Sequence, residues 1–247
     1  MSTQDFCDWR RALAQAARVC LLVAALGTAA LPASAQAPSR KLAPGFTQLA
    51  PQAKLLVLPV DVELFSLSAG GVAEPKAEWT AAAHQHMQAA LQANLGKRGL
   101  GLTLADDALA DEFAEQLGVQ AAVMRSIAQH HAGADVWALP TKQGLLDWSL
   151  DDTMQGLQAK TGADYGLFVW VRDSYASTER KVAMAVLALV GVGVGGGVQV
   201  GYASLVDLRT GRVLWFSLLA RGSGDLREAD PAHESVEALL AGFPAKP

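Results

Sequence analysis

The chain has 247 residues, of which 51% are hydrophobic and 18% charged, and its net charge at pH 7 is −4. A mildly acidic chain without a basic cluster exerts no long-range attraction on nucleic acid or anionic lipid, which excludes nucleic-acid binding as its main role. Its two cysteines, Cys7 and Cys20, lie near the N-terminus. The rest of the chain therefore has no thiol for a disulfide, a thiolate metal site or a cysteine nucleophile.

The first 35 residues have the pattern of a secretory signal peptide. Basic residues precede an uncharged apolar run over residues 19–31, and the small residues after it favour cleavage between Ala35 and Gln36. The run of about 13 residues is shorter than the roughly 20 that span a bilayer as a helix. Arg10 and Arg11 leave the twin-arginine route open beside the general route, which we favour. We expect a periplasmic protein.

Residues 36–53 are rich in Pro, Ala and Gln and are predicted to be a flexible linker. A single α/β domain is expected at 54–247. Its hydrophobic patterns predict nine elements. Along the chain these are a strand at 55–65, a helix at 74–98, a strand at 100–105, one or two helices counted as one element between 106 and 133, a helix at 149–160, strands at 161–175, 198–208 and 211–221, and a helix at 231–240.

The last two predicted strands are joined by a short turn at Thr210 and Gly211, which forces antiparallel pairing. The predicted fold class is α/β (α+β), in the order β-α-β-α-α-β-β-β-α. We expect a single mixed sheet with a C-terminal three-stranded antiparallel part, and helices that cover the sheet.

An apolar, glycine-rich insertion at 182–198 carries no polar side chain. Its glycines satisfy G-x-G-x-x-G, but a nucleotide loop needs a strand before it and a helix after it, and here the order is reversed. The favoured interpretation is a buried helix and glycine turn that cover the sheet. Contact with a partner or with lipid is the alternative. The candidate contact residues are then the large apolar side chains Val186, Leu187, Leu189, Val190, Val192 and Val194.

Candidate metal ligands are His130, His131 and Asp147, which only long-range assembly could bring together. No nucleophile elbow or S-x-x-K motif is present, so the sequence specifies no catalytic residue, and no cofactor is expected. Two carboxylates at predicted strand ends, Asp173 and Asp207, could instead form a charged cluster at one sheet edge.

Several short motifs fall around the C-terminal strands: Gly162-Ala163-Asp164, Val206-Asp207, Thr210-Gly211 and Trp215. With the strand at 54–60 and the closing amphipathic helix, this layout resembles the periplasmic α/β domain of curli-secretion-channel-like and related Gram-negative envelope lipoproteins. The resemblance covers about 54–60 and 161–240 and leaves 106–160 without a counterpart. It implies a non-enzymatic envelope component that assembles with itself or with partners. The chain lacks the lipidated cysteine common in such proteins.

The leading hypothesis is an exported periplasmic accessory or assembly protein that binds an envelope protein partner or forms a homo-oligomer, without catalysis. One alternative is an exported metal-dependent hydrolase that uses His and Asp ligands. Another is a protein with peripheral membrane contact through residues 182–198.

Overall fold

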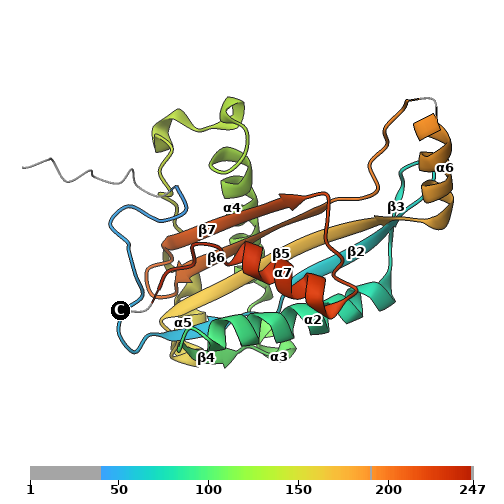
Figure 1. Ribbon diagram of the computed structural model, residues 1–247. Helices are drawn as coiled ribbons and strands as arrows, with labels where there is room; N and C mark the ends of the chain where they lie inside the picture. The colour runs from blue at the N-terminus through green and yellow to red at the C-terminus, as the bar shows by residue number, and fades with distance from the viewer. Residues whose placement is uncertain (1–39, 190, 246–247) are drawn as a thin grey trace, which may run out of the picture. The chain divides into compact units, whose positions relative to one another are not determined.

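The computed structural model describes residues 40–189 and 191–245. The predicted signal peptide, its cleavage site at Ala35 and Gln36, and the first residues of the predicted linker lie outside the described residues. In the described part, a seven-stranded mixed sheet carries helices on both faces (Figure 1). This confirms the predicted fold class.

The elements follow one another much as the hydrophobic patterns predict. The strands are β1 (Lys54–Val57), β2 (Asp61–Leu67), β3 (Ala73–Pro75), β4 (Gly101–Leu104), β5 (Tyr165–Ala176), β6 (Gln199–Asp207) and β7 (Val213–Arg221). The α-helices are α2 (Ala77–Gly96), α3 (Asp107–Glu112), α4 (Ala114–His130), α5 (Gln155–Thr161), α6 (Thr178–Leu189) and α7 (Ala229–Leu239). Three 3-10 helices are η1 (Asp135–Trp137), η2 (Pro140–Lys142) and η3 (Asp151–Met154).

The long strand predicted at 55–65 is two strands that lie end to end along one edge of β5. Both β1 and β2 pair with β5 in parallel, β1 near its start and β2 along its second half. Between them the amide of Leu58 still bonds to Leu167, but Pro59 has no amide hydrogen to continue the ladder. On the side away from β5, β1 pairs with β4 and β2 pairs with β3. This edge of the sheet is therefore also formed by two separate strands.

On the other edge of β5, strands β6 and β7 pair antiparallel as predicted. Their turn is held by Asp207, whose carboxylate accepts hydrogen bonds from the amides of Arg209 (2.9 Å) and Thr210 (3.0 Å). Gly211 follows at φ +69°, and a Cβ there would lie 2.0 Å from the carbonyl oxygen of Asp151. Only glycine fits this position without moving the backbone.

The structure differs from the predicted flexible linker over its described part, residues 40–53. Leu42 pairs with Trp215 on the outer edge of β7, and the amide of Ala43 donates to Leu214 (2.9 Å). Leu49 is buried, and its amide donates to Ala245. Edge pairing and burial therefore fix a segment that has no periodic pattern of its own.

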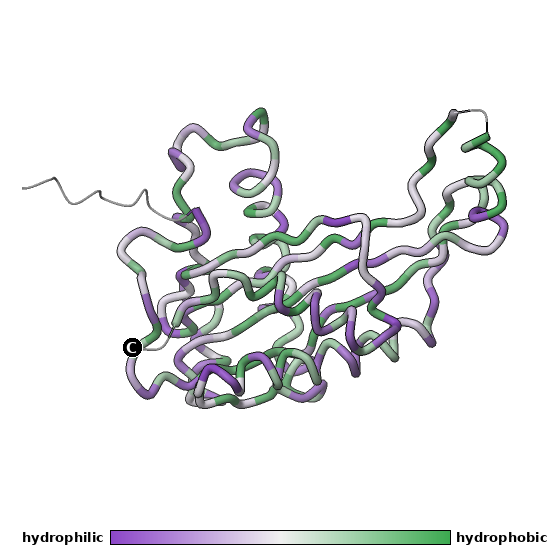
Figure 2. Tube along the Cα trace, in the orientation of Figure 1, coloured by the Kyte–Doolittle hydropathy of each residue, from purple (hydrophilic) through white to green (hydrophobic). Residues whose placement is uncertain are grey.

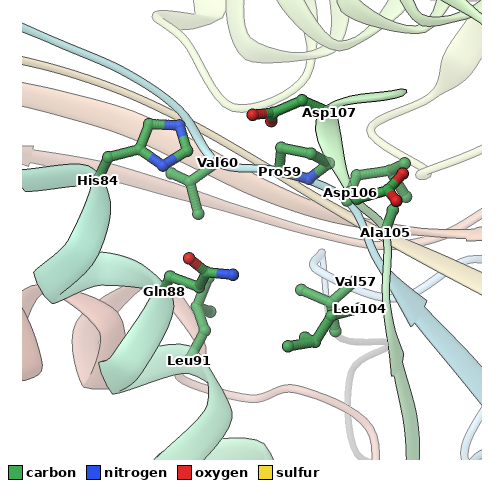
Figure 3. Close-up of a pocket in the computed structure, with 11 residues that line it drawn as sticks. Val57, Pro59, Val60, His84, Gln88, Leu91, Leu104, Ala105, Asp106 and Asp107 are labelled. Carbon is green, nitrogen blue, oxygen red and sulfur yellow. The ribbon is translucent and has the colours of Figure 1, made fainter. Parts of the chain in front are cut away.

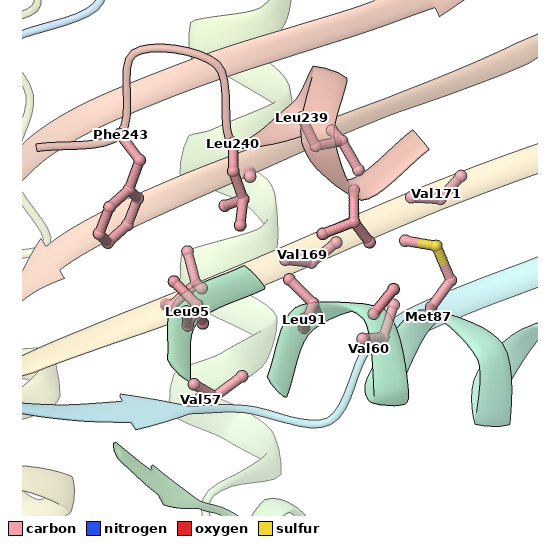
Figure 4. Close-up of a cluster of buried hydrophobic side chains, with 14 of the residues drawn as sticks. Val57, Val60, Met87, Leu91, Leu95, Val169, Val171, Leu239, Leu240 and Phe243 are labelled. Atoms are coloured by element: carbon pink, nitrogen blue, oxygen red, sulfur yellow. The ribbon is translucent and has the colours of Figure 1, made fainter. Parts of the chain in front are cut away.

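One face of the sheet is covered by α2 and α7, whose apolar side chains meet over the central strands (Figure 4). Met87, Leu91 and Leu95 of α2 are spaced by four residues and lie on one side of the helix. They pack with Leu239 of α7 and with Val169 of β5. This cluster is the larger of the two apolar cores in the described residues.

The opposite face is covered by α4, η3 and α5. Its core contains Met124 and Ile127 of α4 and the aromatic series Trp170, Tyr202 and Phe216, whose neighbouring ring centroids lie 5.2 and 5.7 Å apart. These strand aromatics pack as core residues between the sheet and its covering helices. Within residues 40–189 and 191–245, none of the helices combines the length and apolarity needed to cross a membrane.

Candidate docking surface

Helix α6 and the glycine-rich segment that follows it form a projection between β5 and β6, defined here as the protrusion, residues 178–189 and 191–198. Figure 1 shows α6 beyond the end of the sheet, and Figure 2 shows that hydrophobic residues dominate it. None of the twelve residues of α6 is buried. The favoured interpretation of a buried helix covering the sheet is therefore wrong. The apolar residues after Lys181 indicate contact with an apolar surface but do not show whether that surface is the sheet.

The base of the protrusion is fixed by polar contacts. Ser177 caps α6, because its hydroxyl accepts a hydrogen bond from the amide of Arg180 (3.2 Å). The Arg180 guanidinium donates to the carbonyl of Gly195 (2.9 and 3.1 Å) and to that of Ser68 (3.3 Å). Gly197 lies so close to β5 that a Cβ would be 1.9 Å from the Ser174 oxygen. These contacts hold the helix to the returning segment and to the end of β2.

Beyond this base, the protrusion exposes large apolar side chains. Leu189 is 87% exposed, and Val182 and Val186 are 61% and 58% exposed. Of the remaining predicted contact residues, Leu187 and Val192 are exposed and Val194 is half-buried. Val190 lies outside the described residues.

A buried polar network lies below the protrusion. The Asp173 carboxylate accepts hydrogen bonds from the Tyr175 hydroxyl (2.5 Å), the Gln199 side-chain amide (2.7 Å) and the Ser174 amide (2.8 Å). Burial raises the pKa of Asp173, and these three donors oppose that rise. Gln199 in turn accepts from Arg221 (2.8 Å). The network ties the end of β5 to the start of β6 and the end of β7.

The network continues into the loop before α7. The Tyr175 hydroxyl accepts from the amide of Leu226 (2.7 Å), and the Arg227 guanidinium stacks on the rings of Tyr175 and Trp79 at 4.1 and 4.7 Å. Arg227 also donates two hydrogen bonds to Asp225, which lower the pKa of that carboxyl. The loop is thus held against α2 and β5.

The charged cluster predicted around Asp173 and Asp207 does not form. The two residues pair with opposite ends of their neighbouring strands, Asp173 with Gln199 and Asp207 with Tyr165. Asp207 serves the β6–β7 turn instead. The sequence identified two carboxylates with structural roles but did not show that one of them is buried.

Two cavities flank the break at Pro59. The first, of about 250 Å³, lies at the ends of β1 and β4, and Figure 3 shows His84 and Gln88 of α2 facing Asp107 across it. Its remaining carboxylate, Asp106, caps α3 through the amide of Leu109 (2.8 Å). Of the polar side chains that line this cavity, only that of Asp106 forms a hydrogen bond to a described residue.

The second cavity, of about 260 Å³, lies between α4 and the sheet and is lined by aromatic and aliphatic side chains. Burial raises the pKa of Tyr202, one of its lining residues, to about 12. No described residue forms a hydrogen bond to the Tyr202 hydroxyl. Gln120 on the same wall is hydrogen-bonded to Ser204 (3.3 Å).

No protein-family model matches the chain, and no curated protein matches it. Among solved structures, the chain is similar to the PelC dodecamer from Paraburkholderia phytofirmans, with 14% identity, coverage of 82% of this chain and 94% of that one, and a TM-score of 0.39. It is also similar to lipoprotein GNA1162 from Neisseria meningitidis, with 19% identity, coverage of 68% and 79%, and a TM-score of 0.28. The LpoB C-terminal domain from Salmonella enterica gives 17% identity, coverage of 72% and 87%, and a TM-score of 0.30.

The three candidate metal ligands, His130, His131 and Asp147, are not brought together in the described residues. The His130 imidazole is hydrogen-bonded to the carbonyl of Trp137 (2.7 Å), and that of His131 to the carbonyl of Arg40 (2.6 Å). Asp147 is exposed. In the described ranges, no three His, Cys, Asp or Glu side chains are placed to hold a metal ion.

Proposed function

We propose that this chain is an exported, non-catalytic accessory component of the Gram-negative cell envelope that acts by docking, with the protrusion as its docking element. The observation that supports this proposal is the exposure of Val182, Val186 and Leu189 on a projection with a fixed base. Exposed apolar surface of this kind marks interaction sites, because its burial against another surface is favourable. The docked surface is a protein partner, a second copy of the chain or a membrane.

A rigid base is consistent with docking. Arg180 joins α6, the returning glycine segment and the end of β2, so the apolar tip is presented in one orientation. A preformed surface loses less conformational entropy on binding than a flexible one. The histidines of the metal-dependent hydrolase alternative are bonded to backbone carbonyls, and no observation favours that function.

Site-specific photocrosslinking in intact cells tests the proposal. A photoreactive residue replaces Leu189 in one strain and Val136, which is 81% exposed outside the protrusion, in a control strain. We expect an adduct from position 189, with a protein or with phospholipid, that Val186→Asp in the same chain abolishes, and no such adduct from position 136. Equal patterns from the two positions would contradict docking by the protrusion.

A further inference from the structure

We propose that the tip of the protrusion inserts into one leaflet of a lipid bilayer. This inference rests on the proposed docking function and names the surface to which the protrusion docks. Four features of the tip carry it: exposure around the whole helix, capped backbone carbonyls, a cation at the base, and a length suited to one leaflet.

The first feature is that no side of the tip is covered. Residues 185–189 of α6 are exposed at all five consecutive positions, which is more than one full turn of an α-helix. A helix that docks in a protein groove uses one apolar stripe and keeps a polar face towards water. Here the apolar surface surrounds the helix, and a lipid phase can contact all of it at once.

The second feature is that backbone carbonyl groups at the end of α6 accept hydrogen bonds from the segment that follows it. Gly191, at φ +79°, donates its amide to the carbonyl of Ala188 (3.1 Å), and Val192 donates to the carbonyl of Leu187 (3.0 Å). This pair of bonds is the Schellman pattern, and it satisfies carbonyls that the end of a helix would otherwise leave open. In hydrocarbon, where no water can replace a missing bond, such capping is required.

The third feature is the charge at the base. Of the charged residues of α6, Glu179 and Lys181 are exposed, and Arg180 is bonded to the Gly195 and Ser68 carbonyls. The Lys181 ammonium has no partner among residues 40–189 and 191–245. An ammonium just outside an apolar segment can pair with lipid phosphates while its aliphatic stem lies along the apolar surface.

The fourth feature is length. From Lys181 to Leu189 the helix rises by about 12 Å, at 1.5 Å per residue. Half the hydrocarbon thickness of a bilayer is about 15 Å. With its axis along the membrane normal, α6 therefore enters one leaflet while Lys181 stays at the headgroups. This depth matches a helix that does not cross the membrane.

The test uses the exported protein and neutral phosphatidylcholine vesicles, because the chain is acidic and its insertion depends on apolar contact. We expect the protein to float with the vesicles, and to do so equally at high salt. The double variant Val186→Asp and Leu189→Asp should lower the partition coefficient at least about a hundredfold, since carboxylates at these positions oppose entry into hydrocarbon. The matched control, Val119→Asp and Val136→Asp, changes two exposed valines outside the protrusion and should bind like the parent protein.

A fluorescence measurement gives the depth independently. Cys7 and Cys20 are replaced by serine, and a single cysteine at position 189 or 136 carries an environment-sensitive dye. We expect a several-fold rise in emission and quenching by spin-labelled acyl chains for position 189, with neither for position 136.

Three results would overturn the lipid inference: no flotation, flotation that the double aspartate variant retains, or flotation that high salt abolishes. A position-189 adduct with one defined protein or with a second copy, in a chain that does not bind vesicles, would leave the docking function intact and remove the lipid leaflet as its target. Absence of both adduct and vesicle binding would remove both proposals.

Discussion

Replacement of Tyr175 by phenylalanine removes one hydroxyl from the buried network and tests whether that network holds the base of the protrusion. The hydroxyl donates to Asp173 (2.5 Å) and accepts from the amide of Leu226 (2.7 Å). A hydrogen bond to a charged group contributes about 1.5–3 kcal/mol and a neutral one about 1 kcal/mol. Tyr175 is half-buried, so water can replace part of this hydrogen bonding. We therefore expect the free energy of unfolding of Tyr175→Phe to fall by about 2–3 kcal/mol at pH 7.

Urea denaturation of parent and variant measures this loss, and the thermal midpoint should fall by about 4–10 °C. Tyr202→Phe is the matched control. It removes the hydroxyl of a more deeply buried tyrosine that has no hydrogen bond to any described residue, so its stability should stay within about 0.5 kcal/mol of the parent. Equal stability of the two variants would refute the importance assigned to the network.

The loss of stability caused by Tyr175→Phe should also depend on pH. Burial raises the pKa of Asp173, so ionisation of this carboxyl lowers stability as the pH rises through its folded pKa. Removal of a donor to the carboxylate raises that pKa further. The difference between parent and variant is therefore greatest above the raised pKa of the variant. It shrinks as the pH falls through the folded pKa of the variant and then that of the parent, both above the unfolded value of about 3.9, because the carboxyl is then protonated in both folded proteins.

Two further substitutions test other parts of the fold. Gly211→Ala places a Cβ against the backbone of Asp151 and should destabilise the protein by about 3 kcal/mol or more. The control is Gly45→Ala, at φ +77° with no atom within 4 Å of the new Cβ, which should cost only about 1 kcal/mol. Thermal denaturation measures both losses. Arg227→Gln removes the partner that lowers the pKa of Asp225 and should cost about 1 kcal/mol near neutral pH. That stabilisation is present above the unfolded carboxyl pKa and is lost as the pH falls through the lower folded value, so parent and variant should converge in acid urea titrations.

Local chemistry made several elements predictable from the sequence. Asp106 caps α3, Gly162 ends α5 in the left-handed conformation, and the turn at Gly211 joins two antiparallel strands. Each of these depends on a few neighbouring residues, and the same residue types have the same effect in most folds.

Features that depend on distant partners were not predictable in this way. The pairing of Leu42 with β7 needs only backbone groups, so side-chain patterns do not reveal it. The exposure of Val186 and Leu189 depends on what lies beside α6 in space, and the part of this helix after Lys181 has no polar face to indicate the answer. The break between β1 and β2 was predictable in principle, because Pro59 has no amide hydrogen to donate to a neighbouring strand. The continuous apolar run around Pro59 instead favoured one long strand.

The end-to-end placement of β1 and β2 on β5 has a consequence for the time course of folding. Lys54 and Asp164, which meet through a hydrogen bond of 2.9 Å where β1 and β5 begin, are 110 residues apart in the chain. Pairing between such distant segments is slow to form, because the intervening chain loses conformational entropy on closing before any contact compensates for that loss. During synthesis, β1 and β2 lack their central partner until β5 has left the ribosome.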